Sequence, residues 1–97
     1  MLFEWDSAKE KKNITKHGIS FSVAAKVFGD PFRIELFDKS HSNNEDRYIT
    51  IGRIDSELIV LTVVYTERDD TIRLISARRA DGKERRDSRS GRIWRIP

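Results

Sequence analysis

Residues 71–79, with the sequence TIRLISARR, combine strand-forming side chains with arginines, and this combination limits how the chain can fold. Ile72, Leu74 and Ile75 are typical of a half-buried β-strand. Arginine, in contrast, is almost never fully buried unless it is paired. The arginines of this strand must therefore reach a sheet edge, a cleft or an anion.

Side-chain alternation along this strand bears on where its arginines point. In a regular strand, Arg73 and Arg79 share one face and Arg78 lies on the other, because successive side chains point to opposite faces. A β-bulge between Arg73 and Arg78 would bring these two side chains to the same face. The sequence leaves both arrangements open.

The size and composition of the chain predict one small domain over residues 1–97. The 97 residues include no cysteine, which excludes disulfides, thiolate metal sites and cysteine nucleophiles. The first six residues carry acids where a secretory signal carries basic residues, and no apolar run approaches the length of a membrane helix. We therefore expect a soluble, cytoplasmic protein that does not contact a membrane.

Charge is unevenly distributed along the chain. Its formal net charge is +3, but residues 78–97 hold seven arginines and one lysine against three acids, whereas the remainder is slightly acidic. Residues 88–97 show no helical or strand period, so they are predicted to form an irregular basic tail.

Hydrophobic periodicity predicts the order of the elements. Helices are expected at residues 7–17, 21–28 and 80–87, and strands at 33–37, 47–53, 57–66 and 71–79, after a brief strand or anchor at 3–5. Asp6 or Ser7 is predicted to cap the first helix, Gly18 to end it and Ser20 to cap the second. The fold class is α+β: two N-terminal helices packed on an antiparallel four-stranded meander, with a short C-terminal helix.

The residues available for chemistry exclude several classes of site. The two histidines, His17 and His41, stand in no metal-binding spacing, and no nucleotide-binding or hydrolase motif is present. What remains is a set of cationic and proton-transferring side chains: Lys9, Lys16, His17, His41, Glu45, Arg47, Glu67, Arg68, Arg73 and Arg78. This set suits RNA cleavage by the RNA's own 2′-hydroxyl, because the protein then supplies only a base, an acid and charge stabilisation.

Several of the candidate residues also have a structural interpretation. Lys9 and Lys16 fit a solvated helix face as well as a phosphate-binding stripe. His17 fits the negative end of a helix dipole as well as proton transfer. Glu67 and Arg68 fit a surface ion pair, and Trp5 fits the core as well as a platform for base stacking.

The chain resembles the BrnT family of bacterial toxins over residues 3–86. The resemblance rests on matching residues in matching order: residues 3–6, Lys9, Asn13, residues 16–18, Phe21, Ala24, residues 27–28, 30–31 and 41–42, Glu45, Arg47, residues 51–52, 64–68 and 72–78, Ala80 and residues 84–85. After residue 86 the chain departs from the family pattern.

The resemblance implies a ribonuclease toxin of a type II toxin–antitoxin system, with a RelE-like fold, that cleaves RNA and inhibits translation. It implies as partner a BrnA-like antitoxin with a ribbon-helix-helix part, which binds operator DNA as a complex with the toxin. A homodimer, or a heterotetramer with the antitoxin, is the expected assembly. The family positions that chemistry would use are Lys16, His17, Glu67, Arg68, Arg73 and Arg78.

We therefore expect an endoribonuclease that needs neither metal nor cofactor. Its predicted catalytic residues are His17, Glu67, Arg73 and Arg78, and its predicted RNA-binding residues are Trp5, Lys9, Lys16 and Arg68. If Arg73 and Arg78 lie on opposite faces, one of them contacts substrate and the other is structural. The alternative hypotheses are a non-catalytic RNA-binding module and a protein-interaction domain that uses the same cationic face.

Overall fold

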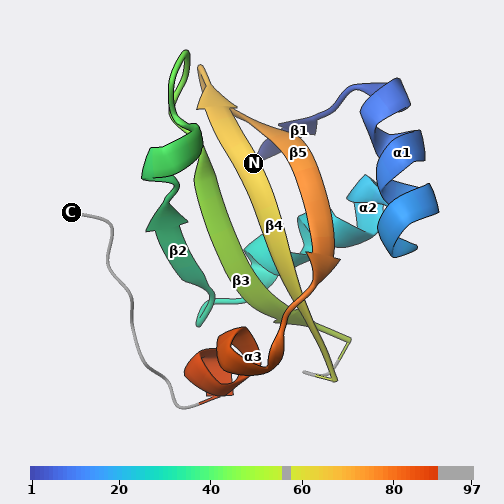
Figure 1. Ribbon diagram of the computed structural model, residues 1–97, viewed down its shortest axis with the longest axis vertical. Helices are drawn as coiled ribbons and strands as arrows, with labels where there is room; N and C mark the ends of the chain where they lie inside the picture. Colours follow the sequence, from blue (N-terminus) through green and yellow to red (C-terminus); the bar gives the residue numbers. More distant parts are fainter. Residues whose placement is uncertain (56–57, 90–97) are drawn as a thin grey trace.

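The computed structural model describes residues 1–55 and 58–89 and consists of one mixed β-sheet with helices on both of its faces (Figure 1). The strands are β1 (Leu2–Glu4), β2 (Ile34–Phe37), β3 (Tyr48–Ile54), β4 (Ile59–Arg68) and β5 (Thr71–Arg79). Their order in the sheet is β1-β5-β4-β3-β2. Strands β2 to β5 pair antiparallel with their chain neighbours, as the meander predicts.

The sheet has five strands rather than the four of the predicted meander, because the segment expected to be a brief strand or an anchor forms β1. Strand β1 pairs parallel to β5, with Phe3 beside Ile72 and Glu4 beside Arg73. Three residues are too few for periodicity to identify a strand with confidence. Tertiary packing holds β1 in place, because the ring of Phe3 lies 5.3 Å from that of Phe28 in the core.

Helix α1 (Ser7–His17) begins and ends where its capping residues predict. The Asp6 carboxylate accepts hydrogen bonds from the backbone N–H groups of Ala8 and Lys9, and Gly18 ends the helix in the left-handed conformation at φ 73°. The Glu10 carboxylate accepts a hydrogen bond from the backbone N–H of Phe21, at the start of the next helix.

The predicted helix at residues 21–28 is divided into two elements. Helix α2 (Phe21–Ala24), which Ser20 caps as predicted, continues as the 3-10 helix η1 (Ala25–Gly29). The tightened turn places Val27 against Gly52 of β3, at a distance where a Cβ atom on Gly52 would meet Val27 Cγ1 at 2.6 Å. Close contact between η1 and the sheet therefore accompanies the change of helix type.

Burial separates the two faces of the sheet. The main core lies between the sheet and α2 and η1, and consists of Ile19, Phe21, Ala24, Val27, Phe28, Ile54, Leu61, Val63, Tyr65, Ile72, Leu74 and Ala77. The opposite face has a smaller cluster of Ile34, Ile51, Val60 and Ala80. Strand β4 is central and contributes buried residues to both clusters, as its apolar sequence predicts.

Helix α3 (Gly82–Arg89) lies at one end of the second face, against β3 (Figure 1). Asp81 and Glu84 form a reciprocal capping box, because each carboxylate accepts the backbone N–H of the other residue. The helix includes residues 88 and 89, so the prediction of an irregular tail is wrong for these two residues. The rest of the predicted tail, residues 90–97, lies outside the described residues.

Candidate functional site

A β-bulge in β5 decides the orientation of its arginines. Val64 of β4 lies opposite Ser76, but the next residue, Tyr65, lies opposite Leu74, so Ile75 has no counterpart in β4. On the two sides of the bulge, Arg73 pairs with Thr66 and Arg78 pairs with Thr62. Thr62 and Thr66 are four residues apart on one strand and share a face, and so do their partners. Arg73 and Arg78 therefore point to the same side of the sheet.

Arg68 points to this side as well, since it follows Thr66 by two residues on β4. The face is the one opposite α2 and η1, because the alternate residues Val63, Tyr65 and Leu74 belong to the main core. We call Arg68, Arg73 and Arg78 together the arginine face. In the described part of the chain, α3 covers one end of this side of the sheet (Figure 1).

Arg68 is held by Glu45 from the loop before β3. Its Nε and Nη2 atoms donate to the two oxygens of the Glu45 carboxylate, each at 3.1 Å. This hydrogen-bonded pair lowers the pKa of Glu45, and the positive charges of Arg47 and Arg73 add to the effect. Arg47 and Arg73 therefore belong to the same electrostatic neighbourhood as Arg68.

Arg73 is the least tightly held of the three arginines. Its Nη1 atom lies 3.7 Å from the Glu4 carboxylate, too far for a hydrogen bond. Its charge also contributes to the lowered pKa values of Asp6 and Glu45. The guanidinium thus stands near several carboxylates, and its hydrogen-bonding groups are not directed to Glu4.

Arg78, in contrast, is fixed at two points. Its Nη1 and Nη2 atoms donate to the two oxygens of Glu84 at 2.8 and 2.9 Å. Glu84 also accepts hydrogen bonds from Thr62 and from the backbone N–H of Asp81. Burial alone would raise the pKa of Glu84, but these hydrogen bonds outweigh it and lower the pKa. Arg78 therefore connects β5 to the first turn of α3.

Comparison with protein families matches residues 5–84 to a family described as the ribonuclease toxin BrnT of type II toxin–antitoxin systems. The chain belongs to the BrnT family. It is thus a member of a family of ribonuclease toxins, whose systems pair the toxin with a protein antitoxin and whose substrate is RNA. Comparison with curated proteins gave no match. None of the helices in the described ranges has the length and apolar character that a bilayer crossing requires.

The other residues that the sequence proposed for this BrnT site lie elsewhere. Glu67 is opposite Ile72 and is exposed at the end of β4, on the opposite face from Arg68. His17 is half-buried in the last turn of α1, which lies along the edge of β5. The structure therefore does not bring His17 or Glu67 together with the arginine face.

The remaining RNA-binding candidates lie on or before α1. Lys9 and Lys16 are exposed, as a phosphate-binding stripe and a solvated helix face both require. Trp5 is half-buried, with its ring edge-on to Phe21 at 6.1 Å. This contact matches the core interpretation of Trp5.

Three side chains around the loop before β3 were noted in the sequence but not assigned to the site. His41, Glu45 and Arg47 line a polar hollow of about 290 Å³ with Asn43 and Asn44. Glu45 pairs with Arg68 of β4. Since Glu45 and Arg68 lie 23 positions apart in the sequence, no local pattern could reveal this pair.

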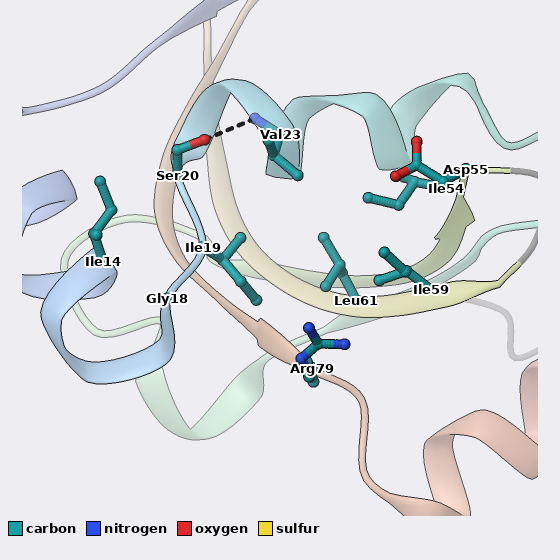
Figure 2. A pocket seen from close by; sticks show the side chains of 10 residues that line it. All are labelled: Ile14, Gly18, Ile19, Ser20, Val23, Ile54, Asp55, Ile59, Leu61 and Arg79. Carbon is teal, nitrogen blue, oxygen red and sulfur yellow. Dashed lines mark hydrogen bonds between the residues drawn. The ribbon is translucent and has the colours of Figure 1, made fainter.

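A second pocket, of about 280 Å³, lies on the helix side of the sheet between α1, α2 and the ends of β3 and β5. The side chains of Ile19, Ile59 and Leu61 face it, with Arg79 and Asp55 at its border (Figure 2). This pocket is mainly apolar and is formed by a different face from the arginine face.

Proposed function

We propose that this chain is a metal-independent endoribonuclease that cleaves RNA through attack of a 2′-hydroxyl on the adjacent phosphate, and thereby inhibits translation and growth. The observation that supports this proposal is the bulge at Ile75, which puts Arg73 and Arg78 on the same side as Arg68. Arginine binds phosphate through paired N–H donors, so such a face suits a polynucleotide backbone.

The proposed reaction needs no nucleophile from the protein. The 2′-oxygen loses its proton to a base and forms a bond to phosphorus, the bond from phosphorus to the 5′-oxygen breaks, and that oxygen takes up a proton. The products are a 2′,3′-cyclic phosphate and a 5′-hydroxyl. Negative charge grows on the phosphate oxygens during attack, and a guanidinium held beside them stabilises that charge.

Within this proposal the three arginines have different roles. Arg73 contacts the scissile phosphate, because its distance to Glu4 leaves its N–H groups available. Arg68 binds the neighbouring backbone phosphate, and this contact replaces its ion pair with Glu45. Arg78 is structural, since its two-point contact with Glu84 joins α3 to the sheet. The exposed Lys9 and Lys16 hold RNA beyond the cleaved bond.

Proton transfer requires a group that reaches the phosphate bound by Arg68 and Arg73. His17 and Glu67 were the candidates from sequence, but one lies beyond the edge of β5 and the other on the opposite face of β4. A group on the side of the arginine face fits this role better.

The proposal extends to partners and location. A BrnA-like antitoxin with a ribbon-helix-helix part neutralises the toxin, and the complex, rather than the toxin alone, binds operator DNA. The toxin acts in the cytoplasm, as a homodimer or in a heterotetramer with its antitoxin. The arrangement of helices on an antiparallel meander supports the expected likeness to RelE.

A second candidate function follows from the ion pairs. Arg68, Arg73 and Arg78 each lie beside a carboxylate, an arrangement that also suits a surface that binds RNA, or an acidic segment of a protein, without cleaving it. Such a module would bind RNA with a steep dependence on salt and would form no product.

Incubation of the purified protein with RNA in EDTA tests the proposal. The expected result is cleavage with 2′,3′-cyclic phosphate ends, and none at a position where a single 2′-deoxynucleotide replaces the ribonucleotide. Cleavage that requires Mg²⁺, or that proceeds at the deoxynucleotide, would contradict the mechanism. Binding without product would favour the second candidate.

A further inference from the structure

Asp38 and His41 form a hydrogen-bonded pair. His41 is the last residue of the 3-10 helix η2 (Lys39–His41), and Asp38 directly precedes this helix. His41 Nδ1 lies 2.9 Å and 3.1 Å from the two carboxylate oxygens of Asp38. The Asp38 side chain is only 13% exposed, whereas the His41 side chain is 66% exposed. The carboxylate is thus enclosed, and the imidazole that it holds extends into solvent.

The turn that carries this pair is attached to the sheet at both ends. The backbone N–H of Asp38 donates to the carbonyl of Arg47 at 2.8 Å, next to β3. The Ser42 hydroxyl donates to the Asp38 carbonyl and accepts from the backbone N–H of Arg47. The position of His41 is therefore defined by hydrogen bonds that cross from one side of the loop to the other.

His41 borders the polar hollow that also contains Glu45 and Arg47. Glu45 in turn holds Arg68, and the positive charge of Arg73 acts on the same carboxylate. The side chain of Glu45 thus joins the hollow to Arg68 and Arg73, which the proposed function assigns to phosphate binding. His41 therefore lines a cavity that Glu45 connects to Arg68.

We propose that His41 is the catalytic residue that removes the proton from the 2′-hydroxyl, and that Asp38 is its positioning residue. This inference rests on the proposed function and names the group that the function requires. An Nδ1–H directed to the Asp38 carboxylate leaves Nε2 with a free lone pair, in the same way that a buried aspartate orients the histidine of a serine protease. Nε2 takes the 2′-proton, and the 2′-oxygen bonds to phosphorus as the bond from phosphorus to the 5′-oxygen breaks. The departing 5′-oxygen takes a proton from water, and the imidazolium returns its proton to the resulting hydroxide.

The test measures cleavage of one RNA transcript in EDTA by the full-length wild type and by His41→Ala. Loss of the base is expected to lower kcat by about 10²-fold or more. Added imidazole is expected to restore part of the activity of His41→Ala, because it replaces the missing group, and to restore nothing to Arg73→Ala. Lys39→Ala removes a cation from the same turn without altering the Asp38–His41 pair, and is expected to stay within a few-fold of wild type.

Asp38 is tested by a conservative pair of variants. Asp38→Asn is expected to lower kcat with KM little changed, while Asp38→Glu retains more activity because it keeps a carboxylate for Nδ1. Equal loss in both variants, together with a lower unfolding midpoint, would show that Asp38 only stabilises the turn, and would contradict its positioning role.

The outcomes separate this inference from the function on which it rests. If wild type cleaves and His41→Ala cleaves equally well, the inference fails and the nuclease assignment stands. Loss of activity in His41→Ala without recovery in imidazole would also overturn it, as would loss and imidazole recovery in His17→Ala instead. If wild type does not cleave RNA in EDTA, both fail together.

Discussion

Arg78 donates two hydrogen bonds to Glu84, and this contact attaches α3 to β5. Removal of Arg78 leaves a partly buried carboxylate with fewer donors, which costs about 1–2 kcal/mol of unfolding free energy. We expect Arg78→Ala and Glu84→Ala each to lower stability in urea unfolding. A double-mutant cycle is expected to show coupling, because the two residues share one contact. Additive effects would show that the pair does not stabilise the fold.

The lowered pKa of Glu84 predicts how stability depends on pH. A carboxylate whose folded-state pKa lies below its ordinary value of 4.5 contributes stability that is fully present above that pH. This contribution is lost as the pH falls through the lower, folded-state value. Urea unfolding between pH 6 and pH 3 is therefore expected to show a smaller loss of stability in Glu84→Gln than in wild type. The same dependence of unfolding free energy on pH in Glu84→Gln and wild type would contradict the lowered pKa of Glu84.

Asn13 supplies the hydrogen bonds that a neighbouring strand would otherwise give to β5. Its side-chain amide donates to the Ala77 carbonyl at 2.9 Å and accepts from the Ala77 N–H at 3.1 Å, and it also donates to the Ile19 carbonyl. The Asn13 side chain is buried, so Asn13→Ala would leave backbone groups unpaired at a cost of about 2–3 kcal/mol. Denaturant unfolding measures this loss. The control is Thr15→Ala, which changes an exposed residue of the same helix. An equal, small loss of stability in both variants would show that the hydrogen bonds of Asn13 do not stabilise the fold.

Gly52 and Gly29 form a matched pair for testing the contact between η1 and β3. A Cβ atom on Gly52 would lie 2.6 Å from Val27 Cγ1 and 3.2 Å from Arg33 Cβ, whereas one on Gly29 would meet nothing within 4 Å. Val27 is fully buried, so Gly52→Ala is expected to cost about 1–3 kcal/mol. Gly29→Ala is expected to have little effect. Thermal unfolding of the two variants would contradict the packing if their midpoints agreed.

Local sequence signals predicted the elements with short-range causes. The caps at Asp6, Gly18 and Ser20 depend on neighbours within a few residues. The sequence of β4 is apolar on both faces, which predicts a central strand. The sequence left residues 3–5 open between a brief strand and an anchor, because the pairing of β1 with distant Thr71, Ile72 and Arg73 is not a local property. Periodicity alone therefore did not decide whether the sheet has four or five strands.

The site was harder to predict than the fold, because its geometry arises from tertiary pairing. Ile75 looks like any strand residue, and the bulge appears only when β5 is aligned with β4. Arg68 and Glu45 meet across 23 positions in sequence. Chemical type alone favoured His17, whereas the position of His41 beside Asp38 follows from the fold of the loop.

The nuclease account rests most directly on Arg73. With RNA in EDTA, Arg73→Ala is expected to lower kcat about 10²- to 10³-fold, because a donor to the developing phosphate charge is lost. Arg73→Lys is expected to fall between Arg73→Ala and wild type, since it keeps the charge and loses the paired donors. Cleavage by Arg73→Ala at the wild-type rate would contradict the account.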